Sequence, residues 1–468
     1  MVDVVVIGAG PAGVVAALRA ADLGAKTTLV TRDAFGGMAA NDGPVPVRTL
    51  AHAARLIRDS RQLGRYGIDV GDPSLDYGRL LERVSEVVDD ARQHSTFRAQ
   101  IDSAGVTVFE NSGVARFAGP NTIETESGLK LHADKVIICT GGVSRQLSVP
   151  GSEFTNTHSD AWTLTDVPPS IIVIGAGATG VQVASIFNAF GSKIQIFQAG
   201  PRILPTEDED VSAAVASAFR ANGIVVKEDF GIINRFEKSP EGVRMYSSKD
   251  GKVEISEATL VIVAIGWVAN TAKLDLTNAG VDTNERGFIQ VDEYLQTSTQ
   301  HIFAAGDVTG RMMLVTQAIQ DGYAAGTNAV KGLEMTIPDQ VVPIGSFTDP
   351  EYAQVGLNEA IARERFDTIV ATVGFDTTTR TIIDGRTNGF CKLVVDRSTR
   401  KILGCHVVGE RAVELTQVAA VAIAAGLSVD AFAQIPLSFP TYAGVLGRAA
   451  GIAAHQINST VRYVAEGI

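Results

Sequence analysis

Cysteine and long apolar runs are scarce in this chain. Only three of its 468 residues are cysteines, Cys139, Cys391 and Cys405, and an odd number at wide spacing matches neither a secreted disulfide framework nor a zinc site. No uninterrupted apolar stretch reaches the ~18 residues that a membrane-spanning helix needs. The N-terminus has no basic region ahead of an apolar core, as a signal peptide would have. We therefore expect a cytoplasmic protein with no metal site and no integral membrane segment.

Basic residues are also fewer than acidic ones. Lys and Arg total 40 against 52 Asp and Glu, which gives a formal net charge of −12. No run of five or more basic residues occurs, so nucleic acid and anionic membranes are not expected partners. The composition, 45% hydrophobic and 20% charged with 16 prolines, is typical of a folded globular protein, and the length predicts roughly two to four domains.

Glycine, in contrast, is abundant at 47 residues, and two segments repeat one glycine pattern. Residues 2–30 and 170–198 each run from a β-branched strand through a glycine-rich turn into an Ala-rich helix and a second strand. The glycines are Gly8, Gly10 and Gly13 in the first segment and Gly175, Gly177 and Gly180 in the second. The first glycine permits a tight turn, the second lets a pyrophosphate approach the backbone, and the third lets the helix pack on the strand. The repeat predicts two dinucleotide sites.

The acidic residue that usually binds the ribose in such sites is missing from both segments. Eighteen residues after the third glycine stand Thr31, followed by Arg32 and Asp33, in the first segment and Gln198 in the second. A neutral Gln can bond a ribose hydroxyl without repelling a 2′-phosphate, but no arginine stands beside Gln198 to bind that phosphate. The second site is therefore compatible with NADH and with NADPH, with a slight preference for NADH.

The remaining sequence predicts further α/β structure. Amphipathic helices are expected at 48–62 and 76–103, a strand at 106–111, a hairpin-like pattern at 115–133 and buried strands at 135–139 and 260–265. From about residue 340, strands near 342–347, 368–373, 389–395 and 402–408 flank a helical stretch at 410–426. The predicted fold is α/β, with two Rossmann-like dinucleotide-binding domains and a separate C-terminal α+β domain.

Several motifs together resemble the flavoprotein disulfide reductases, the family of dihydrolipoamide dehydrogenase, glutathione reductase and mercuric reductase. The resemblance covers roughly residues 2–455, and its motifs, besides the glycine turns, are Thr140-Gly141-Gly142, IGWVANT at 265–271, TSTQHIFAAGD at 297–307, FTDPE at 347–351 and Val355-Gly356. It implies FAD at the first glycine turn, NADH or NADPH at the second, and a homodimer formed by the C-terminal domain. The implied division is 1–145 and 269–338 for the FAD domain, 146–268 for the NAD(P) domain and 339–468 for the dimerisation domain.

The resemblance also assigns the cofactor contacts. It implies that FAD is bound by Gly8, Gly10, Pro11, Ala12, Gly13, Thr31, Arg32, Gly36, Gly37, Arg48, Thr140, Gly141, Gly306 and Asp307. It implies that the nicotinamide dinucleotide is bound by Gly175, Gly177, Ala178, Thr179, Gly180, Gln182, Gln198 and Gly266. A carboxylate at the position of Asp307 can accept hydrogen bonds from the ribityl hydroxyls of FAD; the alternative role for it is a helix N-cap.

The family pattern breaks where its redox-active groups should stand. In the segment GGMAANDGPVPVR, residues 36–48, Ala39 and Pro44 occupy the positions of the two redox cysteines. Near the C-terminus, Phe439 and Gly444 occupy the positions of the acid–base histidine and its glutamate. Thiol–disulfide exchange needs a thiolate, a resolving thiol and a general acid or base. The chain is therefore predicted not to be a disulfide reductase.

Three further residues are candidates for catalysis. Arg48 and Gln182 stand where the family has a lysine and a glutamate near the flavin–nicotinamide junction. An unpaired Arg48 would favour the reduced, anionic flavin, unless it pairs with another carboxylate. The resemblance places Tyr442 at the dimer interface, where it donates a proton toward the partner's flavin or only packs.

These observations predict an FAD enzyme in which NAD(P)H reduces the flavin and the flavin passes electrons directly to a non-disulfide acceptor. A quinone-like molecule, oxygen or a protein carrier would serve. One alternative is transhydrogenation between NADH and NADP⁺. Another is a non-catalytic flavin or nucleotide sensor, or a partner-binding protein, that kept the fold and lost turnover.

Overall fold

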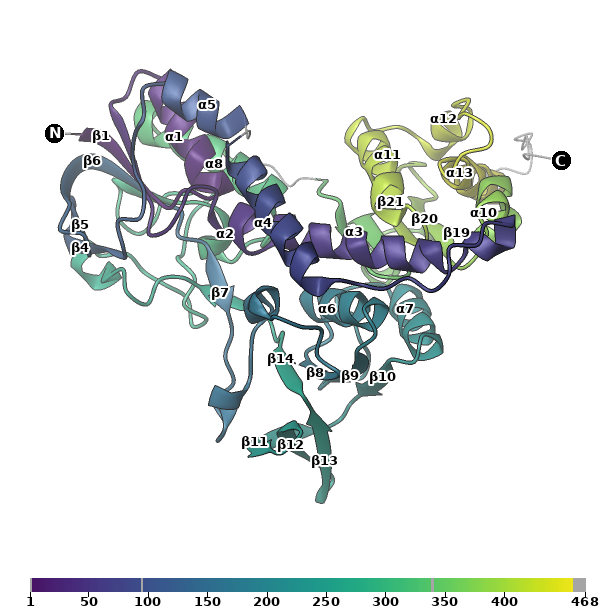
Figure 1. Ribbon diagram of the computed structural model, residues 1–468. Coiled ribbons are helices and arrows are strands. Elements are labelled where there is room, and N and C mark those ends of the chain that lie inside the picture. The colour runs from purple at the N-terminus through teal and green to yellow at the C-terminus, as the bar shows by residue number, and fades with distance from the viewer. Residues whose placement is uncertain (1, 94–95, 338–340, 458–468) are drawn as a thin grey trace.

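The computed structural model describes residues 2–93, 96–337 and 341–457 and has the predicted α/β architecture. Figure 1 shows three parts: a sheet with covering helices near the N-terminus, a second sheet around β8 to β14, and a C-terminal part that carries α11 to α13. The long helix α3, Pro44–Ser60, runs between these parts.

The first sheet has the strand order β3-β2-β1-β6-β5-β4, and β16 pairs in parallel with the C-terminal half of β6, on the edge opposite to β1. Its strands are β1 (Val2–Ile7), β2 (Thr27–Val30), β3 (Thr107–Phe109), β4 (Ala115–Gly119), β5 (Thr122–Thr125), β6 (Lys130–Ile138) and β16 (Ile302–Ala304). The β-branched run of β1 is buried from Val4 to Ile7, as expected for a strand covered on both faces.

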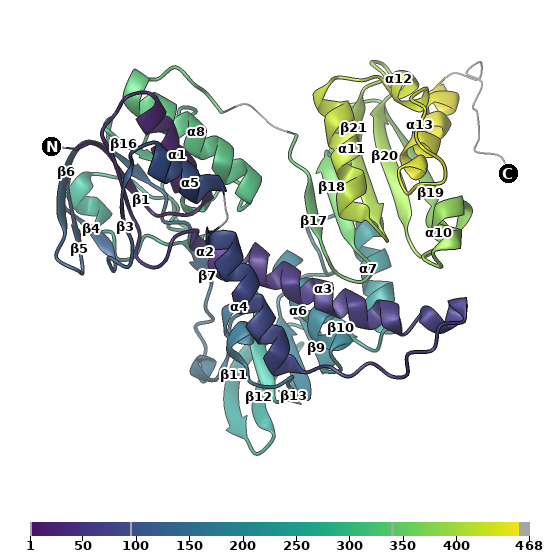
Figure 2. The same cartoon turned by 45° about the horizontal axis from the view of Figure 1, so that its top comes forward.

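Two helices far apart in sequence pack together over this sheet (Figure 2). They are α1, Pro11–Asp22, and α8, Val315–Lys331. A Cβ added at Gly322 would lie 2.2 Å from the carbonyl oxygen of Ala12, and one at Gly326 would lie 2.6 Å from that of Ala16. Glycine therefore sets the close approach of the helices, which attaches the segment after residue 300 to the N-terminal strands.

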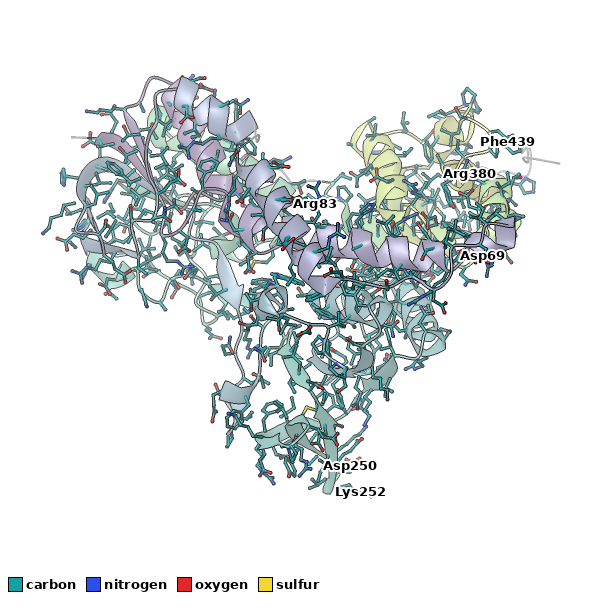
Figure 3. The ribbon with its side chains drawn as sticks, in the orientation of Figure 1. Asp69, Arg83, Asp250, Lys252, Arg380 and Phe439 are labelled. Carbon is teal, nitrogen blue, oxygen red and sulfur yellow. The ribbon has the colours of Figure 1, made fainter. Side chains whose placement is uncertain are left out.

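The second sheet is parallel, in the order β10-β9-β8-β14. Its strands are β8 (Ser170–Ile174), β9 (Lys193–Gln198), β10 (Val225–Glu228) and β14 (Leu260–Val263), and its helices are α6 (Ala178–Ala189) and α7 (Glu209–Ala221). An antiparallel meander, β11 (Ile232–Ser239), β12 (Gly242–Lys249) and β13 (Lys252–Ala258), extends away from the other two parts; Asp250 and Lys252 mark its tip in Figure 3. The ribbon of β7 (Gly142–Ser144) and β15 (Trp267–Ala269) lies between the two sheets.

The helical predictions between residues 37 and 103 differ from the structure at one helix end. The helix expected at 48–62 begins earlier, at Pro44, because proline at the first helical position loses no hydrogen bond. The range 76–103 contains α4 (Tyr77–Gln93) and α5 (Thr96–Ser103), and residues 94–95 between them lie outside the described residues. A short helix, α2 (Gly37–Asn41), precedes α3, and a 3₁₀ turn, η1 (Leu63–Tyr66), follows it.

The C-terminal part is a five-stranded antiparallel sheet in the order β17-β18-β21-β20-β19. Its elements are β17 (Ile344–Ser346), β18 (Tyr352–Gly356), α9 (Glu359–Arg365), β19 (Thr368–Gly374), η6 (Phe375–Thr377), α10 (Thr379–Ile383), β20 (Phe390–Asp396), β21 (Ile402–Val408), α11 (Ala412–Ala424), α12 (Val429–Ala433) and α13 (Gly444–Ile457). The four expected strands are present, and β18 is an additional one. In the part of the chain that the structure describes, no helix is long and apolar enough to cross a membrane.

Candidate functional site

A cavity of about 1200 Å³ lies where the first sheet, the second sheet and the C-terminal part meet. Its walls come from the β1–α1 turn, from residues 31–34 after β2, from α2 and the start of α3, from the segments 139–144, 157–159 and 305–307, and from residues 343–347. A cavity of this size is large enough for an extended dinucleotide.

The first glycine turn forms one wall. Gly8 has a φ of +109°, and a Cβ at Gly13 would lie 1.8 Å from the Gly8 carbonyl oxygen, so α1 rests directly on the turn. Gly37 has a φ of +58°, and its added Cβ would lie 2.6 Å from the Gly10 Cα. Gly10, Pro11 and Ala12 line the cavity at the N-terminus of α1, where free backbone N–H groups favour a phosphate.

The far end of the same wall is formed by the residues after β2. Thr31 is buried and lines the cavity, and Arg32 lines it while its guanidinium pairs with Asp33 at 2.7 Å. Gly36 caps α2 with a φ of +103° and, like Gly13, does not line the cavity.

Two polar side chains of the cavity lining, Thr140 and Asp307, have no hydrogen-bond partner among the described residues. Thr140 Oγ1 is buried with no hydrogen-bond partner among the described residues, and it lies in the cavity lining next to Gly141. The Asp307 carboxylate, beside Gly306, accepts no hydrogen bond from any described residue. Burial and the nearby Asp321 raise the pKa of Asp307 to about 6. Asp307 does not cap a helix, because η5 (Gly306–Thr309) has Ala305 as its N-cap, so the carboxylate is available for ligand hydroxyls.

The second glycine turn repeats the geometry of the first. Gly175 has a φ of +94°, and a Cβ at Gly180 would lie 1.8 Å from its carbonyl oxygen. A Cβ at Gly177 would meet nothing within 4 Å, so the approach to the N-terminus of α6 is open. Ala178 and Thr179 line the cavity.

The other predicted contacts of the second site lie outside the cavity lining. The set comprises Gly175, Gly177, Gly180, Gln198 and Gly266. Gln198 Oε1 accepts a 3.0 Å hydrogen bond from the Ala176 N–H, which turns its amide back onto the glycine turn. Gly266 has a φ of +103° in the segment between β14 and β15.

Arg48 and Gln182 meet where the two nucleotide turns converge. Arg48 Nη1 donates a 2.5 Å hydrogen bond to Gln182 Oε1, and the guanidinium lies 3.8 Å from the centre of the Phe347 ring. The same amide oxygen accepts from Ser346 Oγ at 3.2 Å and from the Phe347 N–H at 3.3 Å. Among the described residues, no carboxylate lies within ion-pair distance of Arg48, and burial lowers its pKa to about 10. The guanidinium is therefore charged at neutral pH and bound by a neutral group.

Comparisons with known proteins agree with this geometry. A family described as pyridine nucleotide-disulphide oxidoreductase matches residues 2–322, and its dimerisation domain matches residues 342–450. The chain belongs to this family. The family is FAD-dependent and uses NAD(P)H, so the chain is an FAD-dependent pyridine nucleotide oxidoreductase.

Relatives of this oxidoreductase cover almost its whole length. It is 30% identical to a dihydrolipoyl dehydrogenase of Vibrio cholerae over 476 residues, 98% of this chain and 96% of the relative. It is 32% identical to a mercuric reductase of Lysinibacillus sphaericus over 431 residues, 92% of this chain and 78% of the relative. A solved structure of RclA, an HOCl-induced flavoprotein disulfide reductase from Escherichia coli, superposes with a TM-score of 0.85 at 26% identity, covering 96% of this chain and 99% of that one.

The three cysteines of this oxidoreductase all lie outside the segment 36–48. Ala39 and Pro44 both line the cavity. Cys391 and Cys405 lie on the neighbouring strands β20 and β21, buried and free. Cys139 is also free and lies in the cavity lining, but it is 6% exposed and its burial raises the pKa of the thiol.

The C-terminal candidates lie apart from the cavity within one chain. The Tyr442 hydroxyl donates a 3.0 Å hydrogen bond to Asp384, and its ring lies 6.3 Å from that of Phe375. Phe439 is 51% exposed, and Figure 3 shows it near the C-terminal end of the C-terminal part. Neither residue is among the cavity-lining residues of the same chain.

Two cavity-lining residues, Asp42 and His158, were not singled out from the sequence. Asp42 lies in the loop between the two positions expected to hold cysteines, and that location was the available signal. No such signal pointed to His158, because its position along the sequence has no recognisable relation to that of Asp42.

Proposed function

We propose that this oxidoreductase passes electrons from NAD(P)H through FAD directly to a non-disulfide acceptor. A quinone-like molecule, oxygen or a protein carrier has the required chemistry, because each accepts electrons from a reduced flavin without a thiol relay. The family membership supports the flavin and the nicotinamide dinucleotide, and the residue types in the cavity support the direct transfer.

The observation that carries the proposal is the pair Ala39 and Pro44 in the cavity lining. A methyl group and a pyrrolidine ring cannot form a mixed disulfide, and no residue in the segment 36–48 is a cysteine. The pair Cys391 and Cys405 does not substitute for them, because both side chains are fully buried in the C-terminal sheet and lie outside the cavity lining.

The chain's own residues suit the first half of the reaction. The glycine turns and the free N–H groups of α1 and α6 would hold the two pyrophosphates, and Asp307 would accept hydrogen bonds from hydroxyl groups of FAD. The charged Arg48 would stabilise negative charge that develops in the cavity, since its partner Gln182 does not neutralise it. When bound, FAD supplies the electron chemistry.

The dimerisation domain supports a homodimer, and the family resemblance leads us to expect residues 438–444 to contribute to the partner's site. Phe439 and Gly444 stand in that segment, and neither can act as an acid or base.

Anaerobic stopped-flow spectroscopy on the FAD-loaded protein tests the proposal. NADH and NADPH are each expected to bleach the flavin absorbance, and a quinone, oxygen or ferricyanide is expected to restore it. Oxidised lipoamide and glutathione disulfide are expected to leave it bleached. Turnover of either disulfide would contradict the proposal, and rapid reduction of thio-NADP⁺ by NADH would favour transhydrogenation. Failure of both nucleotides to bleach bound FAD would favour a sensor.

A further inference from the structure

A titratable pair occupies the cavity wall beside the loop that lacks cysteines. Asp42 follows Ala39 and precedes Pro44, and it lines the cavity together with His158, Ser159, Ser144 and Trp267. The five come from the α2–α3 turn, from the segment entering η3 (Ser159–Thr163), and from the β7–β15 ribbon.

His158 is held in place but lacks one hydrogen-bond partner. His158 is 4% exposed, and its ring packs edge-on against that of Trp267, with ring centres 5.1 Å apart. Nδ1 lies 3.4 Å from Ser144 Oγ, whereas Nε2 is buried without a hydrogen bond from any described residue. Buried imidazole nitrogens normally have a hydrogen-bond partner. Nε2 of His158 is therefore a candidate for binding a partner that enters and leaves the cavity.

Asp42 is the nearest acidic group to that nitrogen. Its Oδ2 lies 4.0 Å from His158 Nε2 and accepts a 2.5 Å hydrogen bond from Ser159 Oγ. The Asp42 carbonyl oxygen accepts a 3.1 Å hydrogen bond from Trp162 Nε1, which fixes the loop. At 4.0 Å the carboxylate is too far for a direct hydrogen bond yet close enough to stabilise a positively charged imidazole.

We propose that His158 is the proton donor to the acceptor when the reduced flavin is reoxidised, with Asp42 as its charge partner. This inference rests on the proposed function and names a residue for its second half. NADH would supply a hydride, bound FAD would relay it to the quinone, and NAD⁺ and a hydroquinone monoanion would result. The Nε2 proton of the imidazolium passes to that anion and completes the hydroquinone, and the neutral imidazole regains a proton from solvent on the Asp42 side.

The charges around His158 determine the pH dependence. Burial lowers the pKa of His158, while Asp42 from the α2–α3 turn and Asp160 from η3 oppose that shift. The other groups packed on the ring, Ser144, Trp162 and Trp267, are uncharged. The proton-dependent step should therefore slow as the pH rises through the pKa of the imidazole, and a variant without the Asp42 charge should show the decline at lower pH.

The test compares acceptors that differ in their need for a proton. The FAD-loaded protein is reduced with NADH and mixed with 1,4-benzoquinone or with ferricyanide, which takes single electrons and no proton, from about pH 5 to pH 9. His158→Gln is expected to slow reoxidation by the quinone by about tenfold or more and to remove its pH dependence, with the ferricyanide and NADH steps unchanged. Asp42→Asn, which leaves the imidazole packing in place, is expected to shift the quinone profile to lower pH. His52→Gln, an exposed histidine on α3, is the matched control.

A second readout does not depend on turnover. In histidine NMR titrations of the FAD-loaded protein, Asp42→Asn is expected to lower the pKa of His158. Equal effects of His158→Gln on quinone and ferricyanide, or no effect on either, would overturn the inference while leaving the proposed function intact. An unchanged His158 pKa in Asp42→Asn would overturn the pairing. A wild-type protein whose reduced flavin reacts with no acceptor would overturn both the proposed function and this inference.

Discussion

Arg48 and Gln182 are joined by a 2.5 Å hydrogen bond from a guanidinium nitrogen to an amide oxygen, at the meeting point of the two nucleotide turns. The sequence interpretation offered an unpaired arginine or one paired with a carboxylate. The structure shows a third arrangement, in which the cation is bound by a neutral amide and stacked on Phe347. Its charge is therefore held in place without being cancelled.

Gln182→Glu is expected to lower the flavin midpoint potential. A carboxylate at this distance would neutralise Arg48 and remove part of the stabilisation of the anionic reduced flavin. We expect a shift of about 30 mV or more, which corresponds to about 1.4 kcal/mol for a two-electron couple. Redox titration against dyes measures it, with the exposed Gln417→Glu as control. A potential that rises or stays constant would contradict the role given to the uncancelled charge.

Gly10→Ala and Gly177→Ala test the two nucleotide sites separately. Both residues have ordinary φ values, −77° and −79°, and an added Cβ would meet only the Gly37 Cα at 3.9 Å in one case and nothing within 4 Å in the other. The fold should tolerate both changes, whereas a pyrophosphate at either turn should not. Gly10→Ala is expected to weaken FAD binding and Gly177→Ala to raise the KM for the nicotinamide dinucleotide, each by about tenfold or more, equivalent to about 1.4 kcal/mol.

Flavin content after gel filtration and steady-state kinetics measure these effects. Gly119→Ala, where an added Cβ also meets nothing within 4 Å, is the control and should change neither quantity. Normal cofactor binding in both test variants would show that the turns serve the fold alone.

The native protein is expected to show no fast-reacting thiols toward Ellman's reagent, before or after reduction with NADH. All three cysteines are buried. Burial raises the pKa of the Cys139 thiol, and a hydrogen bond with Cys405 together with burial raises the pKa of the Cys391 thiol, which lowers the thiolate fraction. The double variant Ala39→Cys/Pro44→Cys should instead expose two thiols after NADH reduction. Two reactive thiols in the wild-type protein would contradict the direct-transfer proposal.

Glu207→Gln is expected to stabilise the protein above neutral pH. The Glu207 side chain is buried at the contact with β18, where Oε1 accepts a 3.3 Å hydrogen bond from Gln354 and Oε2 has no partner among the described residues. Burial raises its pKa from 4.5 to about 7, so the folded state binds more protons than the unfolded state between these values, and stability falls as the pH rises through them.

Removing the ionisable group should recover on the order of 1–3 kcal/mol at pH 8, with little change at pH 4. Thermal unfolding followed by circular dichroism at both pH values measures the difference, and the exposed Glu285→Gln serves as control. Equal effects of Glu207→Gln at the two pH values would contradict a titrating, buried Glu207.

Tyr442→Phe is expected to affect stability rather than electron transfer. The hydroxyl donates to Asp384 within the C-terminal part, and its loss should cost about 1 kcal/mol. The melting temperature should fall slightly, and flavin reoxidation by benzoquinone should keep its rate and pH profile. A selective loss of the quinone reaction would instead assign Tyr442 the proton-donating role across the dimer interface.

The sequence interpretation of the fold succeeded where the signal was local. The α/β class and both glycine turns are confirmed, because a strand, a turn and a helix within about 30 residues have a readable pattern. The helix expected at 76–103 covers α4 and α5, because the amphipathic pattern of these residues is also a local signal. The strand β18 was missed, because its five residues, Tyr352–Gly356, carry only a weak signal.

By itself, the sequence determined that this chain folds around two nucleotide turns and carries no cysteine in the segment 36–48. Glycine spacing, β-branched strands and the identity of single residues settle those points without knowledge of long-range contacts. Only the tertiary structure decided that Gln182 binds Arg48, that the Asp307 carboxylate lies at the cavity with no hydrogen-bond partner among the described residues, and that His158 lies 4.0 Å from Asp42. Each of these relationships depends on contacts between segments far apart in the chain or on the surroundings of one side chain. Such contacts produce no periodic pattern in the sequence that could have predicted them.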